Sequence, residues 1–329
     1  MRIRVIDTVE EFFSIKSAWE SLWKYSKSTV FQSYTINAEA YTQLLSHKTL
    51  QIILLEEKGS IIAIFPCYID NNKTLRFIND DHFDFCGPII SEGIVSNKIF
   101  KLFAKFVQNN KKVSQVFFKN IYNVQVSSLL NYHFKKYKSL LSEVQHCLID
   151  NFNDWGQLTS SEKSELKRIK NKFSQATTTR LSFFPKQDFE SLMNLMVKHG
   201  LRKKNFYNKT FIHWMESVFE RGLMEVWRFE QDGQLLALSC HLVSKESRVV
   251  WIDFYNPKPY ANIAHYIYFL ENIEEKSISL GRGTYGYKMN NFNTIPVNLY
   301  CFYHSKNSIV FIISEIKRVC KLYIKSLIK

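Results

Sequence analysis

Two pairs of apolar runs surround two-residue turn signals, Lys58-Gly59 within residues 50–69 and Asp232-Gly233 within residues 224–243. Runs rich in isoleucine, leucine, valine and aromatic residues on both sides of a glycine turn predict β-hairpins. Apolar positions with helical spacing precede each hairpin and predict two helices before it. In the first half these helices cover 9–25 and a second segment that ends near 46, and in the second half they cover 186–200 and 209–221. The same order of elements therefore occurs twice, which predicts a duplicated domain.

The remaining pattern predicts how each copy is completed. The polar segment 151–161 separates the copies, and Thr159 with Glu162 has the spacing of a capping box for a basic helix over 161–174. Beyond the second hairpin we expect strands over 248–255, 277–280 and 296–303 and a helix over 260–276. A βαβ crossover beside antiparallel hairpins gives a mixed sheet. The predicted fold class is α/β with a mixed sheet, in two tandem domains over 1–155 and 156–304 followed by a basic amphipathic helix over 305–329.

The composition is that of a packed globular protein, because 46% of the 329 residues are hydrophobic and glycine and proline are few. The six cysteines are dispersed and have no histidines at ligand spacing, so we expect reduced thiols and no metal site. Within residues 1–11, polar and apolar positions alternate as in a strand and acidic residues appear early, a pattern that is unlike a signal peptide. No apolar run approaches the roughly 18 residues that span a bilayer. We expect a cytoplasmic protein, either soluble or peripheral to the membrane.

The net charge of +14 favours three classes of binding partner, namely nucleic acid, anionic lipid and phosphate-bearing substrates. The sequence contains no zinc finger, basic zipper or RNA-binding aromatic motif, which argues against nucleic acid. The lysines concentrate locally at 163–172, 198–209 and 317–329. Within 305–329, one helical face is apolar and the basic residues lie largely elsewhere; the apolar face consists of Ile309, Ile312, Ile313, Ile316, Val319, Tyr323 and Leu327. Such a helix can contact anionic lipid, or it can dock its apolar face on the protein body, and the sequence leaves both alternatives open.

Residues 278–288, Ile-Ser-Leu-Gly-Arg-Gly-Thr-Tyr-Gly-Tyr-Lys, combine three glycines with fixed positive charge. Glycines permit positive φ or a close approach to a ligand, and Arg282 and Lys288 supply charge for a phosphate, carboxylate or oxyanion. The glycine spacing also matches a dinucleotide fingerprint. That fingerprint opens a helix after a first strand and has an acidic residue about 20 positions later. The segment fails both conditions, so we interpret the match as coincidental.

Several motifs in this order resemble the GNAT acyltransferase superfamily, in particular the duplicated-domain branch that joins cellulose-biosynthesis-type acetyltransferases to Fem-type peptidyltransferases. The first copy carries Trp19-Glu-Ser-Leu22, Phe31-Gln-Ser33, Ile64-Phe-Pro66 and an aromatic segment over 75–85. The second copy carries Asp232-Gly-Gln-Leu-Leu-Ala237 and ends in the Arg282-Gly283 turn with Tyr287-Lys288. Three features depart from the family pattern: Ser279 replaces the usual aspartate before the turn, Ala261-Asn-Ile-Ala264 replaces a Ser-Pro-Gly entry to the preceding helix, and no pyrophosphate loop is recognisable.

The resemblance implies an acyltransferase that uses acetyl-CoA or another acyl-CoA as co-substrate and has no tightly bound cofactor. Tyr287 becomes a candidate to polarise the carbonyl and Lys288 a candidate anion anchor, with Arg282 and Gly283 as binding residues. Asp253 is a candidate base if it faces a cleft, and His241 is an alternative base. For each of these residues the competing interpretation is structural, namely turn packing, an internal ion pair, a cap or a hydrogen-bonded core histidine.

Outside that segment, Asp84 and Arg202 are candidate substrate contacts, Asp84 for an amine or sugar acceptor and Arg202 for a phosphate. The resemblance points to an acceptor that is a cell-surface polysaccharide precursor, small or lipid-linked, or a related bacterial metabolite. One alternative is a Fem-like transferase that uses aminoacyl-tRNA, the only case in which nucleic acid is a partner. Another is a non-catalytic GNAT-like scaffold in glycan assembly.

Overall fold

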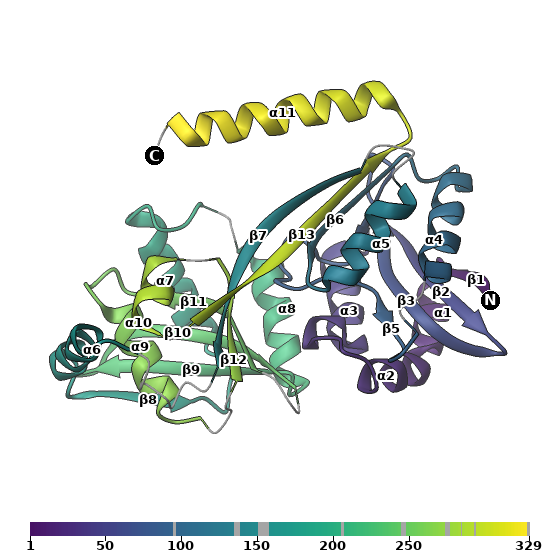
Figure 1. Ribbon diagram of the computed structural model, residues 1–329. Helices are drawn as coiled ribbons and strands as arrows, with labels where there is room; N and C mark the ends of the chain where they lie inside the picture. The colour runs from purple at the N-terminus through teal and green to yellow at the C-terminus, as the bar shows by residue number, and fades with distance from the viewer. Residues whose placement is uncertain are drawn as a thin grey trace. The chain divides into compact units, whose positions relative to one another are not determined.

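A computed structural model describes residues 1–94, 97–134, 139–150, 158–204, 207–244, 248–273, 277–283, 285–292 and 294–327 (Figure 1). The chain forms two compact units. The first unit combines Met1–Val144 with Leu299–Lys329, and the second unit is Gln145–Asn298.

The first unit is a mixed sheet with helices. In chain order its elements are β1 (Arg2–Ile6), α1 (Val9–Ser14), α2 (Lys16–Lys24), η1 (Val30–Gln32), α3 (Tyr34–Ala40), η2 (Tyr41–Leu45), β2 (Thr49–Glu57), β3 (Ser60–Ile69), β4 (Thr74–Phe77), β5 (Ile89–Ile90), α4 (Asn97–Asn109), β6 (Gln115–Ile121), α5 (Val124–Phe134), the start of β7 (Ser139–Asp150), most of β13 (Thr294–Ser305) and α11 (Ser308–Leu327). Its strands lie in the order β1-β2-β3-β4-β6-β13, with β5 beside β3. All neighbours are antiparallel except β4 and β6, which run parallel.

The first predicted hairpin is confirmed as β2 and β3. Its turn residues Lys58 and Gly59 have φ of 51° and 83°, and two consecutive left-handed residues give the turn whose twist matches the strands. Behind the hairpin, Phe65 of β3 stacks on Phe103 of α4 with ring centroids 4.2 Å apart. The hairpin is therefore fixed both by its turn and by core packing.

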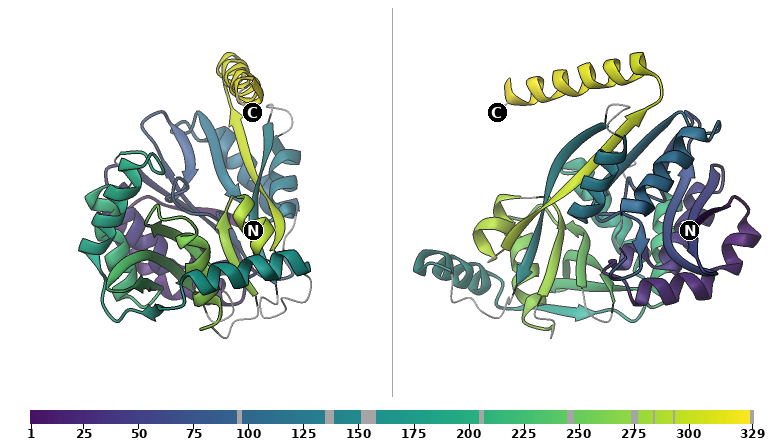
Figure 2. Two further views of the ribbon diagram at one scale, coloured as in Figure 1. Left: turned by 90° about the vertical axis from the view of Figure 1, so that its left-hand side faces the viewer. Right: turned by 45° about the vertical axis from the view of Figure 1, so that its right-hand side comes forward.

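The end of the chain returns to the first unit, which differs from the domain boundaries that the sequence suggested. From Tyr300 to Ser305, β13 pairs antiparallel with β6, and the two strands lie side by side in Figures 1 and 2. This pairing satisfies the backbone groups at the edge of β6. It therefore assigns 299–304 and the helix that follows to the first unit.

The second unit repeats the arrangement. Its elements are the end of β7, α6 (Ser160–Lys172), β8 (Ala176–Arg180), α7 (Lys186–Lys198), α8 (Lys209–Glu220), β9 (Met224–Gln231), β10 (Gln234–Val243), β11 (Arg248–Tyr255), α9 (Ala261–Leu270), β12 (Ser277–Arg282), α10 (Gly286–Asn291) and the start of β13. Its strands lie in the order β7-β12-β11-β10-β9-β8. As in the first unit, only one described pair, β11 with β12, is parallel.

The second hairpin, β9 and β10, is also confirmed, with Asp232 and Gly233 at φ of 52° and 73°. The capping box at the start of α6 forms as predicted, because the backbone N–H of Thr159 donates to the Glu162 carboxylate. Each unit thus runs hairpin, strand, helix, parallel strand. The mixed α/β fold and the duplication are both as the sequence predicted. Within the described ranges, no helix has the length and hydropathy that a membrane crossing requires.

Candidate active site

In the second unit the two parallel strands separate soon after they meet. β11 and β12 pair only at Arg248–Ile278 and Val249–Ser279. β11 then continues to Tyr255 without a further partner in β12. Since the strands no longer hydrogen-bond to each other beyond that point, side chains from β11, α9 and α10 can enter the space where they part. Asp253 lies on this end of β11, which pairs with β10 but not with β12.

Asp253 is held by a buried tyrosine of the crossover helix. The hydroxyl of Tyr266, on α9, donates to Oδ2 of Asp253, and the Tyr266 ring packs against the ring of Tyr287, with centroids 6.1 Å apart. The structure therefore brings together two of the predicted residues, Asp253 and Tyr287, through a third that the sequence pattern does not single out.

The other oxygen of Asp253, Oδ1, is buried and has no hydrogen-bond partner among the residues that the structure describes. Burial raises the pKa of Asp253, while the hydrogen bond from Tyr266 and the charges of Lys288 and Arg202 pull it back down. Leaving a buried acceptor unpaired costs about 1–3 kcal/mol, and more for a charged group. A donor from outside the chain would remove that cost.

Lys288 and Arg202 place positive charge near this carboxylate. The Lys288 side chain is buried, and its ammonium group donates to the backbone carbonyl of Leu280 and lies 5.3 Å from the Tyr285 ring centroid. Arg202, half-buried in the loop after α7, favours the ionised form of Asp253. Of the predicted residues, Asp253, Tyr287, Lys288 and Arg202 thus share one electrostatic environment.

The Arg282-Gly283 turn closes β12 with an irregular backbone. The register with β7 shifts between Ser279 and Arg282, and the N–H of Gly281 donates to the Ser279 hydroxyl at 3.2 Å. The serine that replaces the family's aspartate therefore accepts a backbone hydrogen bond within this bulge. Gly283 has φ of +104°, and a Cβ there would lie 2.7 Å from the Tyr285 ring. Arg282 is half-buried at this turn.

His241 lies in a separate buried cluster. Its Nε2 is 2.7 Å from the Ser239 hydroxyl, its Nδ1 is 3.4 Å from Arg248, and His265 contacts the same serine at 2.7 Å. Burial, followed by the charge of Arg248, holds the pKa of His241 well below its usual range. Both ring nitrogens are thus engaged in a neutral imidazole, an arrangement that describes a core histidine more closely than an accessible base.

Three exposed cations gather at the start of α9. Arg168 and Lys172 of α6 lie 4.8 Å and 5.2 Å from the ring centroid of Tyr260, the residue that precedes α9. Lys258 lies two residues earlier in the chain and 5.4 Å from the ring of Phe173. Arg168 also donates two hydrogen bonds to Glu165, so Lys172 and Lys258 are the cations that add to the positive potential at the start of the helix.

In the first unit, another segment of the same unit fills the place where the two parallel strands separate. β4 and β6 pair in parallel only at Thr74–Gln115 and Leu75–Val116. Beyond them, the side chain of Asn120 donates to the carbonyls of Asp80 and Phe83 at 3.2 Å and 2.7 Å, and Cys86 forms a bridge with Ile121. Segment 78–86 therefore lies along β6, and the candidate Asp84 is buried within it.

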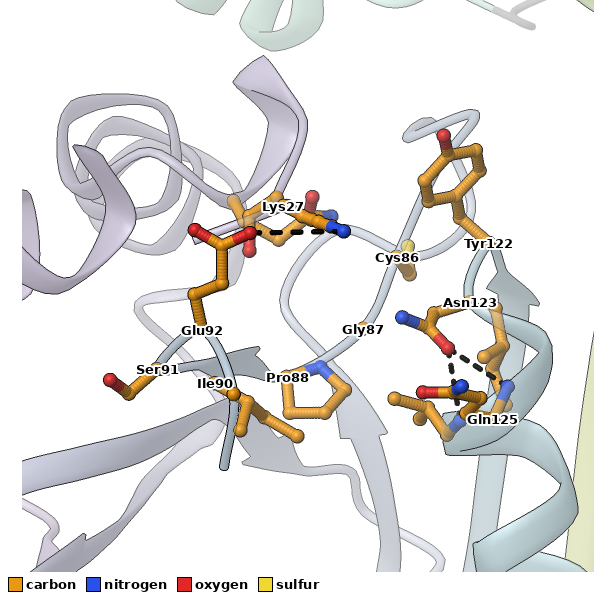
Figure 3. A pocket seen from close by; sticks show the side chains of 15 residues that line it. Lys27, Cys86, Gly87, Pro88, Ile90, Ser91, Glu92, Tyr122, Asn123 and Gln125 are labelled. Atoms are coloured by element: carbon orange, nitrogen blue, oxygen red, sulfur yellow. Dashed lines mark hydrogen bonds and ion pairs between the residues drawn. The ribbon is translucent and has the colours of Figure 1, made fainter. Parts of the chain in front are cut away.

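The first unit has its own pocket, of about 300 Å³, beside this segment (Figure 3). Gly87 and Pro88 form one side, and an ion pair between Lys27 and Glu92, 3.7 Å long, lies across from Asn123. The Asn123 side chain caps α5 by accepting from the N–H groups of Gln125 and Val126. Gln32, of the Phe-Gln-Ser motif, donates to the carbonyl of Phe85 and so has a structural role.

No model of a known protein family matches the sequence, and a search of the curated proteins finds no match either. Solved structures do match in fold. FemX is 9% identical, with a TM-score of 0.65 over 95% of this chain and 99% of its own. The C-terminal domain of a putative lysylphosphatidylglycerol synthetase from Agrobacterium fabrum is 12% identical, with a TM-score of 0.58 over 95% and 96%. A tandem GNAT protein of the clavulanic acid pathway is 9% identical, with a TM-score of 0.54 over 92% and 98%.

These likenesses extend over nearly the whole of each chain. The fold is therefore a duplicated GNAT-like fold, and the resemblance predicted from the sequence is confirmed at this level.

Proposed function

We propose that the second unit is an acyltransferase that moves an acyl group from an acyl-CoA to an amine or hydroxyl acceptor. The observation that carries the proposal is the buried Oδ1 of Asp253, which lacks a hydrogen-bond partner in the described chain. An acceptor amine or hydroxyl donates a hydrogen bond of the kind that this oxygen lacks. The same contact is what a general base requires.

In this scheme the acceptor nitrogen or oxygen attacks the thioester carbonyl and loses its proton to Asp253. The carbon–sulfur bond then breaks, and the thiolate of coenzyme A leaves and takes a proton from solvent, to which Asp253 releases the proton that it accepted. Burial raises the pKa of Asp253 and thereby strengthens it as a base. The hydrogen bond from Tyr266 fixes the carboxylate, and Lys288 supplies a charge that moderates the shift.

The donor would be held at the start of α9. Lys172 and Lys258 provide cations for a pyrophosphate group, and Arg168, which pairs with Glu165, lies beside them. This arrangement takes the place of the glycine-rich loop that the sequence lacks. The tandem GNAT protein of the clavulanic acid pathway, described in a form without AcCoA, supports the same donor class. We propose acetyl-CoA as the first donor to test.

For the acceptor we propose a polysaccharide precursor of the cell surface or a related bacterial metabolite. Calorimetry with acetyl-CoA, followed by release of free thiol in the presence of amino-sugar and hydroxyl-sugar acceptors, tests the proposal. We expect saturable binding of acetyl-CoA and acceptor-dependent thiol release. Absence of binding at millimolar acetyl-CoA would exclude this donor.

A second candidate is transfer of an aminoacyl group from tRNA. It is favoured by the fold likeness to FemX, at a TM-score of 0.65, and by the net charge of +14. Filter binding with aminoacyl-tRNA separates the two candidates, because contacts with tRNA phosphates must weaken steeply as salt rises. Salt-sensitive binding of tRNA without binding of acetyl-CoA would favour this second candidate.

A further inference from the structure

The C-terminal helix α11 presents its isoleucines to solvent. Ile309 is 68% exposed, Ile312 and Ile313 are each 46% exposed, Ile316 is 57% exposed and Val319 is 54% exposed. With about 3.6 residues per turn, these five side chains form one stripe along the first three turns of the helix. Soluble proteins rarely expose a continuous apolar face of this kind unless it meets a partner or a membrane.

The attachment of α11 to its own unit fixes the direction of this stripe. Phe311 is buried and stacks on Tyr303 of β13, with ring centroids 5.8 Å apart. Ser314, one turn later, lies 3.1 Å from the Tyr303 hydroxyl. Phe311 and Ser314 lie on the side of the helix opposite to Ile309 and Ile316, because successive residues are about 100° apart.

The sequence left two alternatives open for this helix, contact with lipid or docking on the protein body. The structure does not bury the apolar face on the unit to which α11 belongs. Figures 1 and 2 show α11 leaving the end of β13 and extending beyond the sheet of the first unit. The first turn is capped, since Asn307 accepts from the N–H groups of Ile309 and Val310. The helix is thus anchored at its start with its isoleucines outward.

The charge of α11 indicates which surface it meets. Its second half carries Lys317, Arg318, Lys321 and Lys325, and no acidic residue follows Glu315. Two such helices from separate copies would bring like charges together, whereas an anionic lipid surface attracts each basic residue. At 20 residues the helix is about 30 Å long, but its basic residues suit it to lie within the interface and not to cross it.

We infer that α11 is a membrane-docking helix that lies in the surface of an anionic bilayer with Ile309, Ile313 and Ile316 inserted. Apolar insertion and charge attraction act together in such a helix. The docking surface is separate from Asp253 and does not depend on the proposed acyl transfer.

Co-sedimentation of the full chain with vesicles tests the inference. The vesicles contain either phosphatidylglycerol and phosphatidylcholine in equal parts or phosphatidylcholine alone. We expect binding to the anionic vesicles that weakens as salt rises, and little binding to the neutral ones. The triple variant Ile309→Ser, Ile313→Ser, Ile316→Ser should lose at least about tenfold in partition, given the apolar area that it removes.

Matched controls separate this surface from general effects. Ile295→Ser changes an isoleucine of the second unit that is 54% exposed, and it should bind vesicles like the wild type. Lys317→Gln, Lys321→Gln and Lys325→Gln together should weaken binding about tenfold or more. The same three charges removed at Lys24, Lys101 and Lys111, all exposed in the first unit, should have a clearly smaller effect. Circular dichroism checks that each variant is folded.

Two results would overturn the inference. The first is wild-type protein that stays in the supernatant with anionic vesicles at low salt. The second is an isoleucine variant that binds vesicles like the wild type but changes from dimer to monomer in light scattering, because a second copy would then cover the face.

Discussion

Tyr266 of α9 and Asp253 of β11 are joined by a hydrogen bond from the phenol hydroxyl to Oδ2 of the carboxylate. The bond ties the crossover helix to the strand end that has separated from β12, and it orients a carboxylate whose other oxygen is buried and unpaired within the described chain. Because the side chain of Tyr266 is itself fully buried, this geometry is rigid.

Removing that hydroxyl should change the pH dependence of activity. Burial raises the pKa of Asp253 and the hydrogen bond from Tyr266 lowers it, so Tyr266→Phe should raise the pKa further. A base acts only when deprotonated, so the acid limb of the rate profile should move to higher pH. The measurement is the transfer rate across pH. Tyr268→Phe is the matched control, since the Tyr268 hydroxyl donates to the carbonyl of Phe173 instead. A profile that stays in place for Tyr266→Phe would argue against Asp253 as the titrating group.

The two glycines beside the Arg282 turn should respond differently to alanine. Gly283 has φ of +104° and no room for a Cβ, because the Tyr285 ring would lie 2.7 Å away, whereas a Cβ at Gly286 meets nothing within 4 Å. We expect Gly283→Ala to destabilise the protein by more than about 1 kcal/mol, since both backbone strain and a clash oppose it. Gly286→Ala should be neutral or slightly stabilising. Thermal denaturation measures both, and equal melting temperatures for the two variants would contradict this role of Gly283 in the turn.

The cations at the start of α9 should control donor affinity. Arg168→Gln, Lys172→Gln and Lys258→Gln together should weaken acetyl-CoA binding about tenfold or more, because they remove positive charge from the proposed phosphate site. The comparison is the variant with Lys24, Lys101 and Lys111 changed to glutamine, which removes equal charge from the first unit. Calorimetry gives both dissociation constants. Equal affinities in the two variants would place the donor elsewhere.

In the first unit, the buried ion pair between Arg76 and Asp80 should be important for stability. Asp80 accepts two hydrogen bonds from Arg76, at 2.7 Å and 3.2 Å, and its side chain is fully buried. Asp80→Ala would remove two charge-assisted hydrogen bonds and leave the half-buried Arg76 with Asp81, 3.1 Å away, as its remaining carboxylate, at a cost of about 3 kcal/mol. The neighbouring Asp81 is 56% exposed, so Asp81→Ala should cost below about 1 kcal/mol. Urea denaturation measures the difference, and similar costs for the two variants would refute this assignment.

The fold is accessible from the sequence because its signals are local. The turns at Lys58-Gly59 and Asp232-Gly233 need left-handed backbone, and the Thr159 capping box needs only a spacing of three residues. The return of β13 to β6 could not be predicted in this way. Strand pairing across most of the chain depends on which sheet edge is free, and no short motif encodes that.

The site is predictable only in part. A strand pattern and a turn point to Asp253 and Tyr287, and the structure places both in contact with Tyr266. Tyr266 escapes prediction because a tyrosine among the apolar positions of a helix resembles a core residue. His241 is a titratable residue on a strand and so a natural candidate, but its contacts with Ser239 and Arg248 depend on tertiary packing. Burial of Oδ1 in Asp253 likewise has no local signature.

The most direct measurement is acyl transfer by Asp253→Asn, which keeps the shape of the side chain and removes the base. The control is Asp232→Asn, in the β9–β10 turn, where asparagine tolerates the left-handed φ of 52°. The account predicts that Asp253→Asn binds acetyl-CoA like the wild type but transfers the acetyl group at least about a hundredfold more slowly, while Asp232→Asn is fully active. Transfer by Asp253→Asn at the wild-type rate would contradict it.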